Sequence, residues 1–60
     1  MADELKGLLD KIQEEGVRQA EEKAAAVISQ AEARAAGIVA GAQADAERLV
    51  AEARREIAKL

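Results

Sequence analysis

The sequence predicts an all-α fold, namely a single long helix that forms a parallel coiled coil with eleven-residue repeats. The first observation is that the 60-residue chain contains no Pro, and that most of its hydrophobic half is Ala. Ala buries too little area for a globular core, whereas Ala with Glu, Arg, Lys and Leu is typical of long helices. The second is that pairs of branched apolar residues recur every eleven positions, at Val27-Ile28, Ile38-Val39 and Leu49-Val50.

The repeat places apolar residues in four of every eleven columns, and from Val17 to Leu60 every residue in these columns is apolar. Eleven residues in three turns give 3.67 residues per turn, which predicts a right-handed or nearly straight supercoil. We name these columns the apolar stripe and predict that it forms the helix–helix interface. Its residues are Leu5, Leu9, Gly16, Val17, Ala20, Ala24, Val27, Ile28, Ala31, Ala35, Ile38, Val39, Ala42, Ala46, Leu49, Val50, Ala53, Ile57 and Leu60.

The pattern divides the chain into a helix start at residues 1–16 and a coiled-coil shaft at residues 17–60. Leu8 and Ile12 lie beside the stripe in the first segment and, with Leu5 and Leu9, make a wider apolar patch. One interpretation is a seam that fixes the register of the bundle, since a slip of eleven residues would otherwise match nearly identical columns. The other is a docking patch for a further partner. Both interpretations stay open.

Local signals support a helix over nearly the whole chain. Asp3 is expected to be the N-cap, with Glu4 in the first turn, where a negative charge is favourable. Glu14 and Arg18 are four residues apart in the favourable orientation, so we expect them to pair.

Three glycines count against an uninterrupted helix. Gly16 lies on the stripe, and Gly37 and Gly41 lie off it; each costs roughly 1 kcal/mol against Ala inside a helix. Because neither Pro nor Asn accompanies them, we expect local softening rather than a break.

The charge distribution excludes several classes of partner. The net charge is −3, with seven acidic and four basic residues in residues 1–30 and five of each in residues 31–60, so nucleic acid is not expected as a partner. Between Ala24 and Ala44 only Glu32 and Arg34 are charged, but this segment is too weakly apolar for a membrane span. The opening "MADELKGLL" lacks the features of a signal peptide, which predicts a cytoplasmic location.

No residue pattern indicates catalysis. The adjacent carboxylates Glu14-Glu15 and Glu21-Glu22 point about 100° apart on a helix and cannot act as a joined acid–base pair. Ser29 is the single hydroxyl side chain, and without His or Cys in the chain it has no evident activating base. We therefore predict no catalytic, cofactor-binding or metal-binding residues, and the chain is not expected to be an enzyme.

The stretch "KIQEEGVRQAEEKA" (Lys11 to Ala24), followed by Ala-rich repeats such as "AERLVAEARREI", resembles the N-terminal helix of the E subunit of V-type and archaeal-type ATPases. The resemblance covers nearly the whole chain. It implies a non-catalytic peripheral stalk that resists rotor torque, formed by pairing with the helix of the G subunit in a right-handed coiled coil. It also implies a location peripheral to the membrane and, because the pattern continues to Leu60, a fragment that lacks a C-terminal globular domain. The low charge between Ala35 and Ala44 departs from the family pattern.

Alternative interpretations are the b subunit of F-type ATP synthases, which has similar repeats but an N-terminal membrane helix, and an amphipathic membrane-surface helix. A membrane-surface helix would favour bulky or aromatic residues, whereas Ala20, Ala31, Ala42 and Ala53 make one stripe column small. In isolation the chain is expected to form a parallel homo-oligomer, with a tetramer favoured over a dimer.

Overall fold

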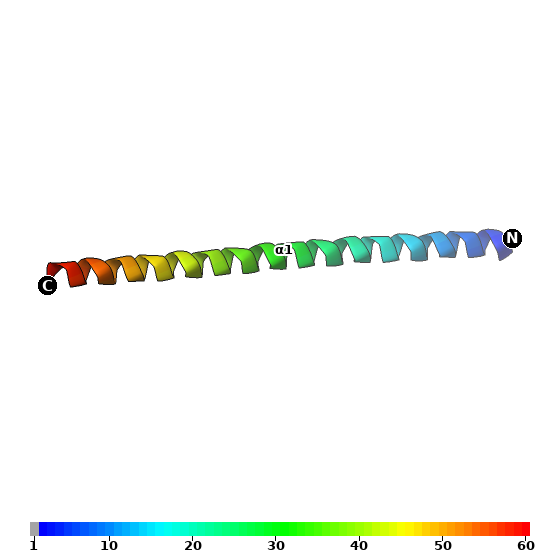
Figure 1. The fold of residues 1–60 in the computed structure, drawn as a ribbon. Helices are drawn as coiled ribbons and strands as arrows, with labels where there is room; N and C mark the ends of the chain where they lie inside the picture. Colours follow the sequence, from blue (N-terminus) through cyan, green and yellow to red (C-terminus); the bar gives the residue numbers. More distant parts are fainter. Residues whose placement is uncertain (1) are drawn as a thin grey trace. The chain divides into compact units, whose positions relative to one another are not determined.

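The computed structural model describes residues 2–60, and nearly all of them belong to one α-helix, α1, which spans Ala2–Lys59 (Figure 1). The helix contains 58 residues, which confirms the prediction of an all-α chain with a single long helix. The chain divides into two units, Met1–Gln30 and Ala31–Leu60, and the features of each unit are described separately below.

The composition explains why the helix is not interrupted. Ala, Glu, Arg and Lys have high helix propensity, and the chain lacks Pro, which would remove a backbone hydrogen bond. None of the glycines has a positive φ, so each continues the right-handed helix instead of ending it. The expectation that Gly16, Gly37 and Gly41 do not break the helix is confirmed.

The two ends of α1 differ slightly from the prediction. The helix begins at Ala2, so Asp3 lies with Glu4 inside the first turn, and the prediction of Asp3 as the N-cap is wrong. Both carboxylates still lie near the free N–H groups of the first turn, where negative charge is stabilising. At the other end, Lys59 is in the last turn, and the N–H of Leu60 donates to the carbonyl oxygen of Ile57 at 3.1 Å.

The helix has no core. No residue in 2–60 is buried, and no second element packs against α1 in that range. The described part of α1 also contains no segment apolar enough to cross a membrane. Packing of α1 against another helix would therefore be the source of most of its tertiary stabilisation.

Candidate helix-association surface

The first unit exposes its part of the apolar stripe. The larger side chains there are between 51% and 64% exposed, namely Leu5, Leu9, Val17, Val27 and Ile28. A helical side chain can be covered only by its neighbours three and four positions away, so the remaining half of each surface needs a second chain to bury it. Ala20 and Ala24 separate the larger residues with small ones.

The second unit repeats the arrangement. Its larger stripe residues are between 50% and 66% exposed, namely Ile38, Val39, Leu49, Val50 and Ile57, and the terminal Leu60 is fully exposed. The remaining stripe residues of this unit are Ala31, Ala35, Ala42, Ala46 and Ala53. Small residues between larger ones allow two helix backbones to approach closely while the larger residues fill the spaces, as in helix pairs with interlocking side chains.

Leu8 and Ile12 are as exposed as the stripe itself, at 57% and 60%. They belong to the first unit, together with Leu5 and Leu9. Leu8 and Ile12 are four residues apart and so lie on one side of the helix, which widens the apolar surface at this end. The register seam and the docking patch both stay predictions.

Every glycine of α1 faces open space. A Cβ placed on Gly7, Gly16, Gly37 or Gly41 would meet no atom within 4 Å. An Ala side chain therefore fits at each of these positions on the helix alone. Gly7 is the glycine that the sequence pattern did not single out, since it lies on neither the stripe nor the GxxxG spacing of Gly37 and Gly41.

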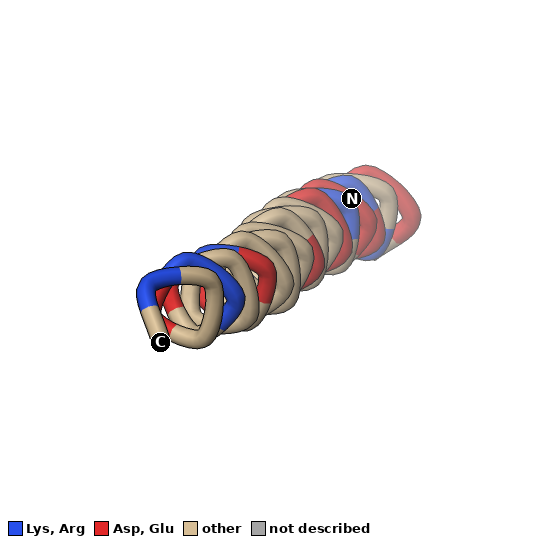
Figure 2. The backbone as a smooth tube through the Cα atoms, turned by 60° about the vertical axis from the view of Figure 1, so that its left-hand side comes forward, with Lys and Arg blue, Asp and Glu red and all other residues tan. Residues whose placement is uncertain are grey.

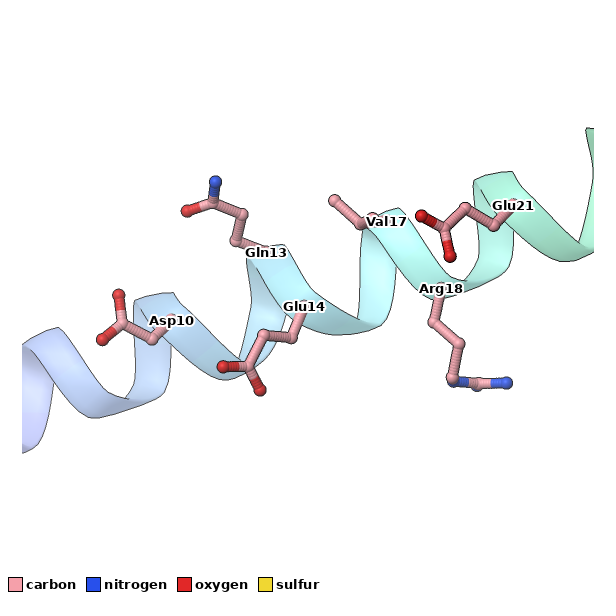
Figure 3. Close-up of a pocket in the computed structure, with 6 residues that line it drawn as sticks. All are labelled: Asp10, Gln13, Glu14, Val17, Arg18 and Glu21. Carbon is pink, nitrogen blue, oxygen red and sulfur yellow. The ribbon is translucent and has the colours of Figure 1, made fainter.

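Charged residues of the first unit pair along the helix, but not as predicted. Arg18 forms ion pairs with Glu15, three residues before it, and with Glu22, four residues after it. The expected pair of Glu14 with Arg18 is wrong, and Figure 3 shows the guanidinium of Arg18 directed away from Glu14. The reason is geometric: Glu15 accepts from both Nε and Nη2 of Arg18, a two-pronged contact that leaves Nη1 for Glu22.

These hydrogen bonds shift the ionisation of Glu15. The bond from Arg18 is the main cause that lowers the pKa of Glu15 below its ordinary value of 4.5. A weaker bond from the side-chain amide of Gln19, at 3.2 Å, acts in the same direction. In return, Glu15 and Glu22 raise the pKa of Arg18, which therefore stays charged.

The second unit has a matching cluster around Arg48. Its guanidinium lies 3.1 Å from Glu52 and 3.7 Å from Asp45, again four residues after and three before. Lys59 also contacts Glu56 at 3.4 Å. All these groups are more than 45% exposed, so each pair adds only a few tenths of a kcal/mol.

The described residues contain no converging site. A shallow hollow lies over Asp10, Gln13, Glu14, Val17, Arg18 and Glu21, and Figure 3 shows these side chains pointing outward from the helix surface. A second hollow lies along Ala46, Glu47, Val50, Ala51 and Arg54. No group of acidic residues within 2–60 is arranged to hold a metal ion. The surface available for binding is the exposed side of a helix.

Comparison with known protein families, with curated proteins and with solved structures gives no match to this chain. The resemblance to a stalk helix therefore stays a prediction from the residues.

Proposed function

We propose that this chain is a structural helix that acts by coiled-coil association along its apolar stripe, as the shaft of the peripheral stalk of a V-type or archaeal-type rotary ATPase. The observation that carries the proposal is the stripe itself. In both units it is made of exposed branched residues and small Ala residues at a regular spacing, and α1 has no core of its own to cover them. Such a helix is stable only when a partner buries its apolar side.

The eleven-residue spacing supports the mechanical part of the proposal. A stripe that repeats at 3.67 residues per turn stays on one side of a helix, so two or more such helices can remain in contact with a shallow right-handed or nearly straight winding. Contact along many turns resists bending and sliding, which is what a stator needs against rotor torque. In the resembling family the partner is the helix of the G subunit, and the complex lies at the cytoplasmic face of the membrane.

The first experiment is sedimentation equilibrium of the chain, alone and after co-expression with candidate partner helices. We expect a helical oligomer, with four chains favoured over two for the chain alone because the stripe spans four columns. Failure would be a helical monomer at high concentration in both preparations. A mass that corresponds to one copy of this chain with one partner helix would support the stalk assignment directly.

A membrane-surface helix is the competing function, because an exposed apolar stripe can also lie on lipid. Circular dichroism with anionic vesicles separates the two functions. A lipid-surface helix gains helicity in proportion to added vesicles at concentrations where the free chain is unfolded. The stalk helix gains helicity with its own concentration instead, and vesicles leave it unchanged. The small Ala column and the absence of aromatic residues favour the second outcome.

A further inference from the structure

The charged residues beside the stripe follow an order of their own. Residues two positions apart lie about 200° apart around an α-helix, which is about 160° when measured the other way. The stripe fills that narrower arc, so one residue of such a pair borders it on each side. One border, which we name the first edge, comprises Asp10, Glu21, Glu32, Gln43 and Arg54. The other, the second edge, comprises Ile12, Lys23, Arg34, Asp45 and Glu56.

The two edges carry opposite charges wherever both are charged. Glu21 lies across the stripe from Lys23, and Glu32 lies across from Arg34. Further along, the signs exchange, because Arg54 lies across from Glu56. Each edge thus changes sign once along the chain, and the two edges change in opposite directions. Figure 2 shows most of the charged residues towards the two termini, with a mainly uncharged stretch between them. In the sequence, Glu32 and Arg34 are the charges between Ala24 and Ala44.

Four of the edge charges form no ion pair on their own helix. In the described chain, no ion pair includes Glu21, Lys23, Glu32 or Arg34, and all four are exposed. The sequence explains this for Lys23, Glu32 and Arg34, since the residues three and four positions from each carry no charge. The clusters around Arg18 and Arg48 are paired on their own helix. Two second-edge residues are paired there as well, because Asp45 contacts Arg48 and Glu56 contacts Lys59.

We infer that the stripe takes a second copy of this chain, parallel and in register, and that the edge charges select this arrangement. The inference rests on the coiled-coil association proposed above, and it concerns the chain alone, apart from the G-subunit helix with which the resembling family pairs. In a parallel assembly the first edge of one helix faces the second edge of the next. At equal height, Glu21 meets the partner's Lys23, Glu32 meets the partner's Arg34, and Arg54 meets the partner's Glu56. Every one of these levels is attractive.

Other arrangements bring like charges together. An antiparallel pair sets each edge against itself, so that the Glu32 residues of the two copies approach each other near the middle, as do the Arg34 residues. In a parallel pair, a slip of eleven residues sets Glu32 against the partner's Asp45, although it keeps Glu21 facing the partner's Arg34. This register therefore retains fewer net attractive levels than the aligned one. A slip of twenty-two residues sets Glu21 against the partner's Asp45 and Glu32 against the partner's Glu56. The stripe repeats at eleven and cannot distinguish these registers, whereas the edges can.

Charge exchange between the edges tests the inference. The first-edge variant is Glu21→Lys with Glu32→Arg, and the second-edge variant is Lys23→Glu with Arg34→Glu. We expect each alone to associate at least about tenfold more weakly than the natural chain, because attractive levels become repulsive. An equimolar mixture of the two variants should regain the natural affinity, since each edge then faces its opposite. The measurement is sedimentation equilibrium at 0.1 M salt, and the differences should shrink at 1 M salt.

The matched control carries all four substitutions and has the composition and net charge of the natural chain. We expect it to associate with itself as the natural chain does, and to be excluded from mixed assemblies with it. Orientation is read separately by adding Gly-Gly-Cys at either end, since the chain has no Cys of its own. In a glutathione redox buffer, we expect disulfides between like ends to predominate.

Three outcomes would overturn the inference. They are variants that associate as tightly as the natural chain, disulfides that join opposite ends, and a natural chain that stays monomeric alone yet binds a different helix on co-expression. The last outcome would leave the stalk proposal standing with another partner. A helical monomer under every condition would instead remove the proposed function itself.

Discussion

Arg18 binds carboxylates on both sides of it along the helix, and it does so on the side of α1 away from the stripe, as Figure 3 shows for Val17 and Arg18. An arginine between acids three residues before and four residues after can hold both at once, because its planar fork has donors on two edges. This arrangement holds the charges of the outer side on one helix. They are therefore not available to select a partner.

Titration of Glu15 tests this cluster. We expect the Glu15 carboxylate to titrate below 4.5, because its bond from Arg18 lowers its pKa in the helix. The pKa of Glu15 in the helix is below its pKa in the unfolded chain. The stabilisation of the helix by this bond is therefore fully present at pH values above the unfolded pKa, and it is lost as the pH falls through the lowered pKa. The titration midpoint of the Glu15 carboxylate is measured by carbon-detected NMR. Arg18→Gln should return the midpoint to the ordinary range, and Lys23→Gln should leave it in place; a midpoint insensitive to Arg18 would contradict the cluster.

The helix as an element combines strong propensity with four weak points. Gly7, Gly16, Gly37 and Gly41 each lie inside α1 with ordinary helical backbone and open space around them. Gly in a helix interior costs roughly 1 kcal/mol against Ala, mainly through backbone entropy. Gly16 differs from the others because it lies on the stripe, where a missing Cβ allows a second helix to approach.

Replacement of glycine by alanine separates these two roles. Gly41→Ala should stabilise the helix by roughly 1 kcal/mol, because nothing on α1 opposes the new methyl group. Gly16→Ala should stabilise the isolated helix equally but weaken the assembly, because the methyl group would fill a site of close approach. Thermal unfolding followed by circular dichroism, at several chain concentrations, distinguishes the two. Equal stabilisation by both variants at high concentration would show that no helix approaches Gly16.

The sequence predicts the backbone of this helix better than it predicts the contacts of its side chains. The helix over Ala2–Lys59 was predictable because propensity and the eleven-residue spacing agree over most of the chain, and the glycines do not interrupt it. The partner of Arg18 was not, because Glu14, Glu15 and Glu22 all lie at helical spacing from it and side-chain rotamers decide among them. The start of the helix was misplaced for a different reason, because sequence signals locate a helix end only to within one or two residues. The stripe itself was predictable, whereas the partner proposed for it does not follow from contacts within one chain.

At the scale of the whole molecule, the proposed association predicts a stability that depends on chain concentration. Each unit exposes its part of the stripe and no residue in 2–60 is buried, so under this proposal folding and association are coupled. Substitutions on the stripe should then act on both at once, whereas substitutions on the outer side should act only on the helix.

Ile38→Asp tests this coupling, with Ala33→Asp as the matched control on the outer side. Both introduce the same residue. Ala33→Asp loses about 0.7 kcal/mol of helix propensity, and Ile38→Asp loses less, because Ile is already a poorer helix former than Ala. We expect Ile38→Asp to dissociate the assembly, because it places one charge per chain at a single level of the interface, at a cost of several kcal/mol. Ala33→Asp should only lower the melting temperature slightly. Sedimentation equilibrium reads the difference, and equal loss of association in both variants would refute the stripe assignment.

The scarcity of charge in the middle of α1 also determines where a protease can act. Between Lys23 and Arg48 the chain contains one basic residue, Arg34, so an enzyme that cleaves after Lys or Arg has one target bond in that stretch. A protease needs several residues in an extended conformation, whereas α1 keeps this bond helical, so cleavage there requires local opening. The rate of that single cut therefore reports the opening of the middle of the helix. In a chain without Trp or Tyr, it does so without any added label.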